Sequence, residues 1–275
     1  MTSEPAGPDM AALQEEQHGA GFDYEPGSPH LRHPRLRNEI IGRIRALLAE
    51  QFERSGRCRV LEVGAGHGSF TDHIAATGAE VTVTEMSRPS LDVLERRFAW
   101  NPQVRLLYDA DGEAVLQDPG RYDVVLCISV LHHVPDYLRF VDRLISKIDE
   151  GGSFASFQDP IWYPRRSRLN MSADRWAYYA WRIGRRDLLR GIGTRVRRAR
   201  KIYDESNAAD MVEYHVVRQG VDDQQLLALL QDRFASVQEW PYWSTQLPSL
   251  QALGSRTGAA TTFGLVARSR AASTS

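Results

Sequence analysis

The sequence predicts an α/β protein built on a mostly parallel sheet with helices on both faces. Three observations support this fold class. Short apolar or β-branched runs alternate with amphipathic helical patterns from about residue 34 to residue 160. A glycine-rich turn joins the first such run to a helical pattern. The run Arg121–Ile128 is almost wholly apolar, which is typical of a strand buried on both faces.

The composition is that of an ordinary globular chain. The 275 residues are 42% hydrophobic and 25% charged, and 34 Lys and Arg against 35 Asp and Glu leave a formal net charge of -1. This balance gives no electrostatic reason to expect nucleic acid as a partner. No apolar run reaches the roughly 18 residues of a membrane span. Cys58 and Cys127 lie in or beside strand patterns and are expected to be buried free thiols. We therefore expect a cytoplasmic protein, and a homo-oligomer is compatible with the sequence.

A single domain, residues 1–275, is expected. Composition divides it into an N-terminal arm and helix (1–57), a core (58–159), an insertion rich in aromatic residues and arginine (160–215), a C-terminal helix with two strands (216–268) and a disordered tail (269–275).

The individual elements follow from local patterns. An amphipathic helix is predicted from Pro34 to Arg54. The five strands of the core are predicted at Arg59–Val63, Glu80–Thr84, Gln103–Tyr108, Arg121–Ile128 and Ser153–Phe157. Helices are predicted between them at Ser69–Thr77, at Ser90–Phe98, and from Pro135 to a stop at Gly151 and Gly152. After the insertion, a helix at Val221–Phe234 and strands at Ser236–Trp243 and Thr261–Arg268 complete the domain.

The motif Val60–Phe70, VLEVGAGHGSF, is the most specific feature of the chain. Its glycines, Gly64, Gly66 and Gly68, suit a turn in which the backbone takes positive φ and a ligand approaches closely. With Glu62 two residues before the first glycine, the stretch resembles motif I of the class I S-adenosylmethionine (SAM)-dependent methyltransferases. The run Tyr122–Val134, YDVVLCISVLHHV, is similar to the motif that follows the fourth strand in that family.

The resemblance covers about Arg59 to Pro160 and implies a fold and a cofactor. The fold is a Rossmann-like, seven-stranded, mostly parallel sheet of order 3-2-1-4-5-7-6, with an N-terminal helical extension and a helical lid insertion. The cofactor is SAM, and the product is S-adenosylhomocysteine. The implied cofactor-binding residues are Glu62, Gly64, Ala65, Gly66, Gly68, Glu85, Met86, Asp109, Ala110 and Ser129.

Two carboxylates have particular roles in this interpretation. Glu85 ends the second strand, where a carboxylate can accept hydrogen bonds from both ribose hydroxyls. The resemblance implies that the side chain of Asp109 contacts the adenine amino group of the cofactor, with Ala110 beside it. Asp111 is an alternative to Asp109.

Candidates for a general base lie after the fourth and fifth strands. Methyl transfer is an in-line displacement, so the enzyme must chiefly hold the nucleophile against the methyl carbon. A base is needed only when that nucleophile is a protonated hydroxyl or amine, and an imidazole can serve near neutral pH. We favour His133, with His132, Asp159 and His215 as alternatives. Methyltransferases of the catechol type hold Mg²⁺ with oxygen ligands from several strand ends. Asp159 could be one such ligand, but the Asp-Asn pair that would accompany it is absent from the sequence, so no metal is expected.

The insertion and the arm are expected to meet the acceptor. Candidate acceptor-binding residues are aromatic: Tyr24, Trp162, Tyr163, Trp176 and Tyr179. The arginines of residues 182–201 are expected on a solvated helix face. The alternatives are that they bind an acceptor bearing phosphate or carboxylate, or an RNA backbone. We expect transfer to a small molecule, such as a hydroxyl oxygen of a secondary metabolite or sugar-bearing compound. The alternatives are an N- or C-methyltransferase and a SAM-fold protein that binds RNA or lacks catalysis.

Overall fold

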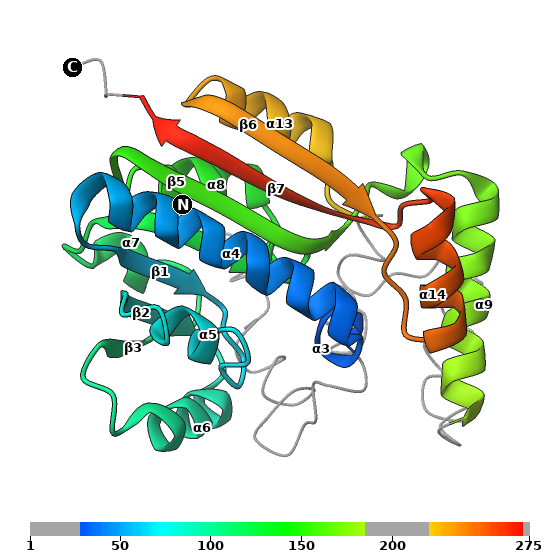
Figure 1. Ribbon diagram of the computed structural model, residues 1–275, viewed down its shortest axis with the longest axis horizontal. Coiled ribbons are helices and arrows are strands. Elements are labelled where there is room, and N and C mark those ends of the chain that lie inside the picture. Colours follow the sequence, from blue (N-terminus) through cyan, green and yellow to red (C-terminus); the bar gives the residue numbers. More distant parts are fainter. Residues whose placement is uncertain (1–27, 185–219, 272–275) are drawn as a thin grey trace, which may run out of the picture.

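A computed structural model describes residues 28–184 and 220–271, and Figure 1 shows their arrangement. The N-terminal arm, most of the arginine-rich segment and the last four residues lie outside these ranges. The described chain forms one seven-stranded sheet of order β3-β2-β1-β4-β5-β7-β6, which confirms the predicted fold. Its strands are β1 (Arg59–Val63), β2 (Glu80–Glu85), β3 (Val104–Tyr108), β4 (Tyr122–Ile128), β5 (Ile148–Pro160), β6 (Phe234–Tyr242) and β7 (Thr262–Arg270).

The strand directions place one edge of the sheet at the site. β1 pairs in parallel with β2 and β4, and the parallel pairs β2–β3 and β4–β5 extend the sheet on either side. β7 is antiparallel to both β5 and β6. The carboxyl ends of the five parallel strands therefore meet at a single edge, where ligands of such folds bind.

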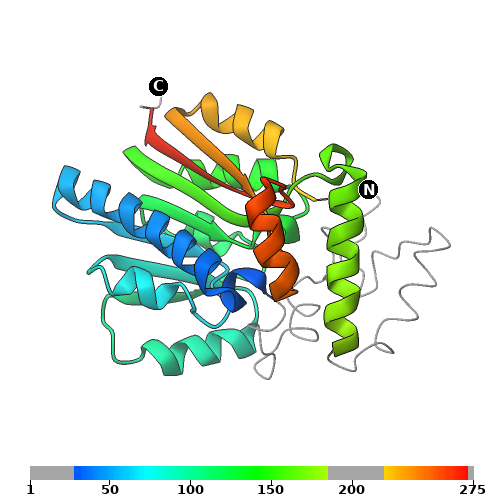
Figure 2. The same ribbon diagram turned by 45° about the vertical axis from the view of Figure 1, so that its right-hand side comes forward.

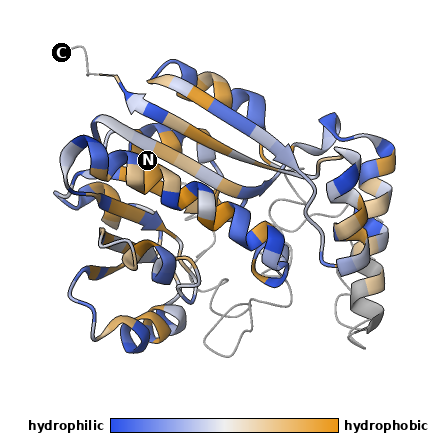
Figure 3. Ribbon diagram, in the orientation of Figure 1, coloured by the Kyte–Doolittle hydropathy of each residue, from blue (hydrophilic) through white to orange (hydrophobic). Residues whose placement is uncertain are grey.

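Helices cover both faces of the sheet and bury two apolar clusters. One face is packed by α4 (Pro34–Ser55), α5 (Thr71–Ala75) and α6 (Arg88–Phe98), and the other by α7 (Ala114–Gln117), α8 (Tyr137–Ile145) and α13 (Asp223–Gln231). The hydropathy colours of Figure 3 show α4 divided into an apolar and a polar side. Of the apolar residues expected on its inner face, Phe52 is half-buried and the others are buried: Leu36, Ile40, Ile41, Ile44, Leu47 and Leu48.

Four further elements lie beyond the carboxyl ends of the parallel strands. They are α3 (Pro29–Arg32), the short 3-10 turn η2 (Tyr163–Arg165), α9 (Arg168–Gly184) and α14 (Pro248–Thr257). In both views α9 runs beside α14 (Figures 1 and 2). The predicted insertion thus begins as a helix, whereas α14 has no counterpart in the prediction. A Trp243 ring packed against Gly254 explains the small residue there, since a Cβ at Gly254 would lie 2.3 Å from that ring.

Several predicted boundaries were wrong. The helix predicted to reach Phe234 ends at Gln231 as α13, and Phe234 begins β6. Gly151 and Gly152 do not stop α8, which ends at Ile145; they lie inside β5, which begins at Ile148. Gly152 is required there because a Cβ would meet the Asp123 carbonyl oxygen at 2.8 Å, where the β4–β5 register shifts. At the other end of the chain, β7 continues to Arg270 because Phe234 of β6 still pairs with it. Residues 269 and 270 therefore belong to the sheet and not to the tail.

The N-terminus of α13 is capped differently from a standard capping box. Asp222 is the N-cap of α13, and its carboxylate accepts from the Gln225 backbone N–H at 3.1 Å. The Gln225 side chain donates to the same carboxylate at 2.8 Å, and Tyr137 accepts the Asp222 backbone N–H at 2.9 Å. The tyrosine on α8 therefore takes the place that the glutamine side chain has in a capping box.

Candidate active site

The glycine turn after β1 takes the conformation that its sequence predicts. Gly64, Gly66 and Gly68 have φ of 65°, 57° and 81°, in the left-handed region that glycine adopts without steric cost. A Cβ on Gly64 would approach Val130 at 2.9 Å, and one on Gly68 would approach the Phe98 ring at 2.6 Å. Glycine therefore allows this turn to pack closely against the start of the loop after β4 and against α6.

Glu85 lies at the end of β2 and is tied to this turn. Its two carboxylate oxygens accept backbone N–H groups of Ser87 at 2.9 Å and Gly66 at 2.8 Å. Burial raises the pKa of Glu85, and these backbone bonds oppose that rise. Each oxygen retains a second lone pair, so the carboxylate can also accept from a ligand hydroxyl. Met86 is half-buried, and the hydroxyl of the adjacent Ser87 caps α6.

Glu62 is buried in β1, two residues before the glycine turn. It accepts the Thr71 hydroxyl at 2.6 Å, which links β1 to the start of α5. Burial raises the pKa of Glu62 to about 7, and the Thr71 bond acts in the opposite direction. The motif I acidic residue therefore has a structural contact that fixes the ends of the glycine turn.

Asp109 and Asp111 occupy different environments at the end of β3. Asp109 is buried, and its two oxygens accept the backbone N–H groups of Ala114 at 3.0 Å and Val115 at 3.1 Å. Burial raises the pKa of Asp109, and these bonds oppose the rise. Asp111 is exposed and accepts the Glu113 backbone N–H at 3.0 Å. Asp109 thus holds the start of α7, and the half-buried Ala110 lies next to it. Of the two carboxylates, Asp109 has the more fixed position and is the one that could recognise an adenine ring.

Ser129 follows β4 in an unusual backbone conformation. Its φ is 60°, and its backbone N–H donates to the Phe157 carbonyl at 2.8 Å. Left-handed conformations of residues other than glycine are uncommon and concentrate at functional sites. The bend sends the chain into η1 (Leu131–His133), which carries both candidate histidines at the carboxyl edge.

The structure pairs His132, and not the favoured His133, with the buried carboxylate of Asp159. His132 Nδ1 lies 2.8 Å from Asp159 Oδ1, which also accepts the His132 backbone N–H at 3.2 Å. Asp159 has no exposed surface, and the Ser156 hydroxyl donates to its second oxygen at 2.6 Å. With the carboxylate as acceptor, Nδ1 carries the proton and Nε2 is the nitrogen able to accept one. The His133 ring lies beside that of His132, with centroids 4.1 Å apart.

The candidate acceptor-binding aromatics are only partly brought to this edge. Trp162 and Tyr163 each carry an arginine on the ring face, Arg165 at 5.4 Å and Arg166 at 5.1 Å. Arg165 in turn pairs with Asp222 and Asp223, which attaches the insertion to α13. Trp176 is 72% exposed. Tyr24 and His215, together with the side chain of Tyr179, lie outside the described residues.

His30 on α3 lies beside motif I. It is buried and stacked on Phe70 of motif I, with ring centroids 5.9 Å apart. Burial, assisted by His132, lowers the pKa of His30 to about 3, so the imidazole is neutral. Within residues 28–184 and 220–271, no hydrogen-bond partner meets its Nδ1. Nearby His33 binds the Thr245 carbonyl at 2.8 Å, which joins α3 to the segment after β6.

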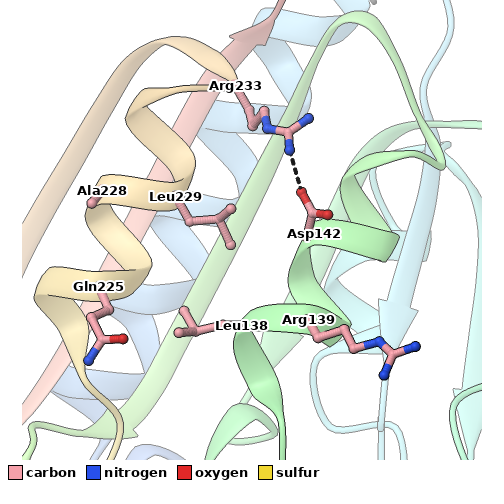
Figure 4. Close-up of a pocket in the computed structure, with 7 residues that line it drawn as sticks. All are labelled: Leu138, Arg139, Asp142, Gln225, Ala228, Leu229 and Arg233. Atoms are coloured by element: carbon pink, nitrogen blue, oxygen red, sulfur yellow. Dashed lines mark hydrogen bonds and ion pairs between the residues drawn. The ribbon is translucent and has the colours of Figure 1, made fainter.

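Other features of the described ranges do not suggest a second centre. A surface pocket of about 510 Å³ lies between α8 and α13 (Figure 4), and none of the candidate residues that the structure describes lines it. It is lined by Leu138, Arg139, Asp142, Gln225, Ala228, Leu229 and Arg233. Among the residues placed by the structure, no cluster of His, Cys, Asp or Glu could hold a metal ion, and no helix is long and apolar enough to cross a membrane.

Comparison with protein families identifies a match that covers more than half of the chain. Residues 32–191 match a family described as a methyltransferase domain. This range contains the glycine turn, the ends of β2 to β5 and α9.

Curated relatives match over a shorter stretch. The chain is 33% identical over 106 residues to a ubiquinone biosynthesis O-methyltransferase of Coxiella burnetii, covering 38% of this chain and 44% of that protein. It is 36% identical over 99 residues to the protein of the same name from Vibrio cholerae, covering 34% and 39%. The aligned stretch thus spans less than half the length of these relatives.

Solved structures share the fold along almost the whole chain. N-methyltransferase NodS from Bradyrhizobium japonicum, in complex with S-adenosylhomocysteine, has a TM-score of 0.52 at 13% identity and covers 96% of this chain and 98% of its own. The N-terminal domain of EvdMO1 with the same ligand also has a TM-score of 0.52, at 18% identity and 95% coverage of each chain.

Proposed function

The chain belongs to the methyltransferase domain family, and on this premise we propose that it transfers a methyl group from SAM to a hydroxyl oxygen of a small molecule. The observation that carries the proposal is the hydrogen-bonded pair of His132 and buried Asp159 at the edge where the glycine turn and Glu85 also lie. The turn and the carboxylate suit the cofactor. The imidazole suits an acceptor that must lose a proton.

The residues around the turn fit SAM in chemical kind. Glu85 offers carboxylate oxygens that backbone amides hold in place, which suits two ribose hydroxyls. Asp109 and Ala110 lie at the end of the adjacent strand, on the adenine side. Gly66, with φ of 57°, carries no side chain, so its backbone could lie close to the methionine part of the cofactor. When bound, SAM supplies an electrophilic methyl carbon on a sulfonium.

His132 would act as the general base. Asp159 fixes the tautomer that leaves Nε2 as proton acceptor, and a positioned imidazole contributes roughly 10²–10⁴-fold to such a proton transfer. The acceptor O–H bond would break as the oxygen attacks the methyl carbon, and the proton would pass to Nε2. Asp159 would stabilise the imidazolium, and methyl transfer would leave S-adenosylhomocysteine.

A hydroxylated acceptor is favoured over a carbon nucleophile because the described edge offers a base, and over a charged amine because the carboxylates of Asp109 and Asp159 are already engaged. The buried carboxylates there already bind backbone or side-chain donors, and His30 is neutral. A phenol, an enol or a sugar hydroxyl fits these surroundings. The names of the curated relatives, which include O-methyltransferase, agree with transfer to oxygen.

An acceptor screen tests this proposal. Purified protein and SAM carrying a labelled methyl group are incubated with phenolic, polyketide-like and sugar-bearing compounds, and the labelled product is analysed for an O–CH₃, N–CH₃ or C–CH₃ bond. We expect an O-methyl product. His132→Ala should lower its formation by about 10²–10⁴-fold, while His133→Ala, its matched neighbour, should retain more of the activity. An N-methyl or C-methyl product would refute the proposed acceptor atom, and failure of the protein to bind SAM would refute the proposed function itself.

A further inference from the structure

A β-bulge in β5 decides which side of the sheet Asp159 faces. In the pairing with β7, Phe157 is opposite Gly264 and Asp159 is opposite Phe263, so Gln158 is an extra residue on β5. Successive residues of a regular strand point to opposite faces, and one inserted residue reverses the alternation after it. Ser156 and Asp159, three positions apart, therefore share a face, and the 2.6 Å bond between their side chains follows from this.

Without the bulge, Asp159 would face the wrong cluster. Phe157 belongs to the apolar cluster under α4, whereas Leu131 of η1 belongs to the cluster on the other face. A regular strand would direct Asp159 to the same face as Phe157. The extra residue directs it to the side of η1, where His132 lies 2.8 Å away.

Gln158 holds the bulge by its backbone conformation and by bonds from the C-terminal part of the chain. Its φ is 68°, a left-handed value that costs energy for any residue with a Cβ. Its backbone N–H donates to the Tyr242 hydroxyl at 2.9 Å, and that hydroxyl donates to its side-chain carbonyl at 3.2 Å. Its side-chain N–H donates to the Ser244 hydroxyl at 2.7 Å. Thr261 fixes Ser244 in turn through bonds of 2.9 Å and 3.0 Å.

We propose that Gln158, whose bulged backbone is held by the Tyr242 hydroxyl, is a positioning residue that sets the His132–Asp159 pair for methyl transfer. The inference rests on the proposed function and adds to it a device from a distant part of the sequence. The same segment carries Thr245, whose carbonyl binds His33 of α3. The segment from Tyr242 to Thr245 thus holds both the bulge beside the His132–Asp159 pair and the N-terminal extension.

Three substitutions separate the backbone conformation from the hydrogen bonds. Gln158→Val opposes the left-handed conformation, because a β-branched side chain is strained there. Gln158→Gly adopts it without cost and loses only the side-chain bonds. Tyr242→Phe removes the hydroxyl and keeps the ring. Tyr122→Phe is the matched control, since its hydroxyl meets Arg105 at 3.2 Å at the opposite end of the sheet.

The readouts are the His132 Nδ1–H proton resonance in NMR spectra, SAM affinity by calorimetry, and the methyl-transfer rate with the acceptor found in the screen. We expect Gln158→Val and Tyr242→Phe to lose the downfield, carboxylate-bonded Nδ1–H signal and about 100-fold in rate, with SAM affinity unchanged. Gln158→Gly should retain the signal and most of the rate, and Tyr122→Phe should retain both.

The proposal is overturned if Gln158→Val or Tyr242→Phe keeps the signal and the rate, or if Gln158→Gly loses as much as Gln158→Val. The NMR comparison needs no acceptor. Failure of the parent protein to bind SAM or to transfer methyl would therefore count against the proposed function separately from the bulge.

Discussion

Gly66 donates its backbone N–H to Oε2 of Glu85 at 2.8 Å, a bond that links motif I to the end of the neighbouring strand 19 residues later. The glycine turn and the carboxylate thus form a single rigid unit. Because Ser87 binds the other oxygen, the orientation of the carboxylate is set before any ligand arrives. Pre-orientation of this kind lowers the entropic cost of binding.

Replacement of Glu85 should weaken SAM binding without unfolding the protein. In Glu85→Gln an amide N–H group must face either the Gly66 or the Ser87 N–H, so one bond is lost and the acceptor for ribose is weakened. Bonds to charged groups contribute about 1.5–3 kcal/mol, so we expect roughly a 10- to 100-fold rise in Kd. Calorimetric titration of SAM measures it. Glu80→Gln, at the exposed start of the same strand, is the control and should bind as the parent does.

Substitution of Gly68 should destabilise the protein more than the same change at Gly78. Both glycines have positive φ, 81° and 86°, so alanine pays a similar conformational cost at each. A Cβ at Gly68 also meets the Phe98 ring at 2.6 Å, whereas nothing lies within 4 Å at Gly78. Overpacking adds about 1–3 kcal/mol. Urea unfolding of Gly68→Ala and Gly78→Ala gives the difference, and equal stabilities would show that α6 yields to the added methyl group.

The buried Glu62 predicts a pH dependence of stability. Burial raises its pKa from the ordinary 4.5 to about 7 in the folded protein. The folded state therefore binds more protons than the unfolded state between these values, and the contribution is fully present below pH 4.5 and is lost as the pH rises through 7. The change is on the order of 3 kcal/mol for a shift of this size.

Glu62→Gln isolates this effect, because it keeps the shape of the side chain and removes the titration. The free energy of unfolding, measured by urea denaturation from pH 5 to pH 8, should fall more steeply with pH for the parent than for the variant. Parallel curves would contradict the assignment of this pH dependence to Glu62.

Changes around Asp159 should affect catalysis and not cofactor binding. Asp159→Asn can reverse the hydrogen bond to His132 and favour the other tautomer, so we expect a loss of about 10²–10⁴-fold in kcat with the Kd for SAM unchanged. Ser156→Ala removes one donor to the same carboxylate and should cost less than Asp159→Asn. Steady-state kinetics with the identified acceptor measures both. A loss for Ser156→Ala as large as that for Asp159→Asn would show that the hydroxyl, too, is essential to the geometry.

Local patterns predicted the parts of the site that depend on neighbours in sequence. The glycines of motif I, the strand end at Glu85 and the helix Pro34–Ser55 are set by backbone freedom and by side-chain periodicity, and both are readable in the letters. The start of β5 could not be read, because Gly152, one of two adjacent glycines that resemble a helix stop, serves close packing against Asp123. The choice between the two histidines could not be read either, because His132 and His133 are adjacent and chemically identical.

The sequence by itself determined the fold class and the position of the glycine turn, because these follow from hydrophobic periodicity and from the conformational freedom of glycine. The strand order was implied by the resemblance of its motifs to a known family. Only the tertiary structure decided that His132 is the histidine paired with Asp159. That outcome depends on one extra residue in β5, held by Tyr242, which lies 84 positions further along the chain. Hydrogen bonds over such a separation leave no periodic trace in a sequence, since their partners come together only when the sheet has formed.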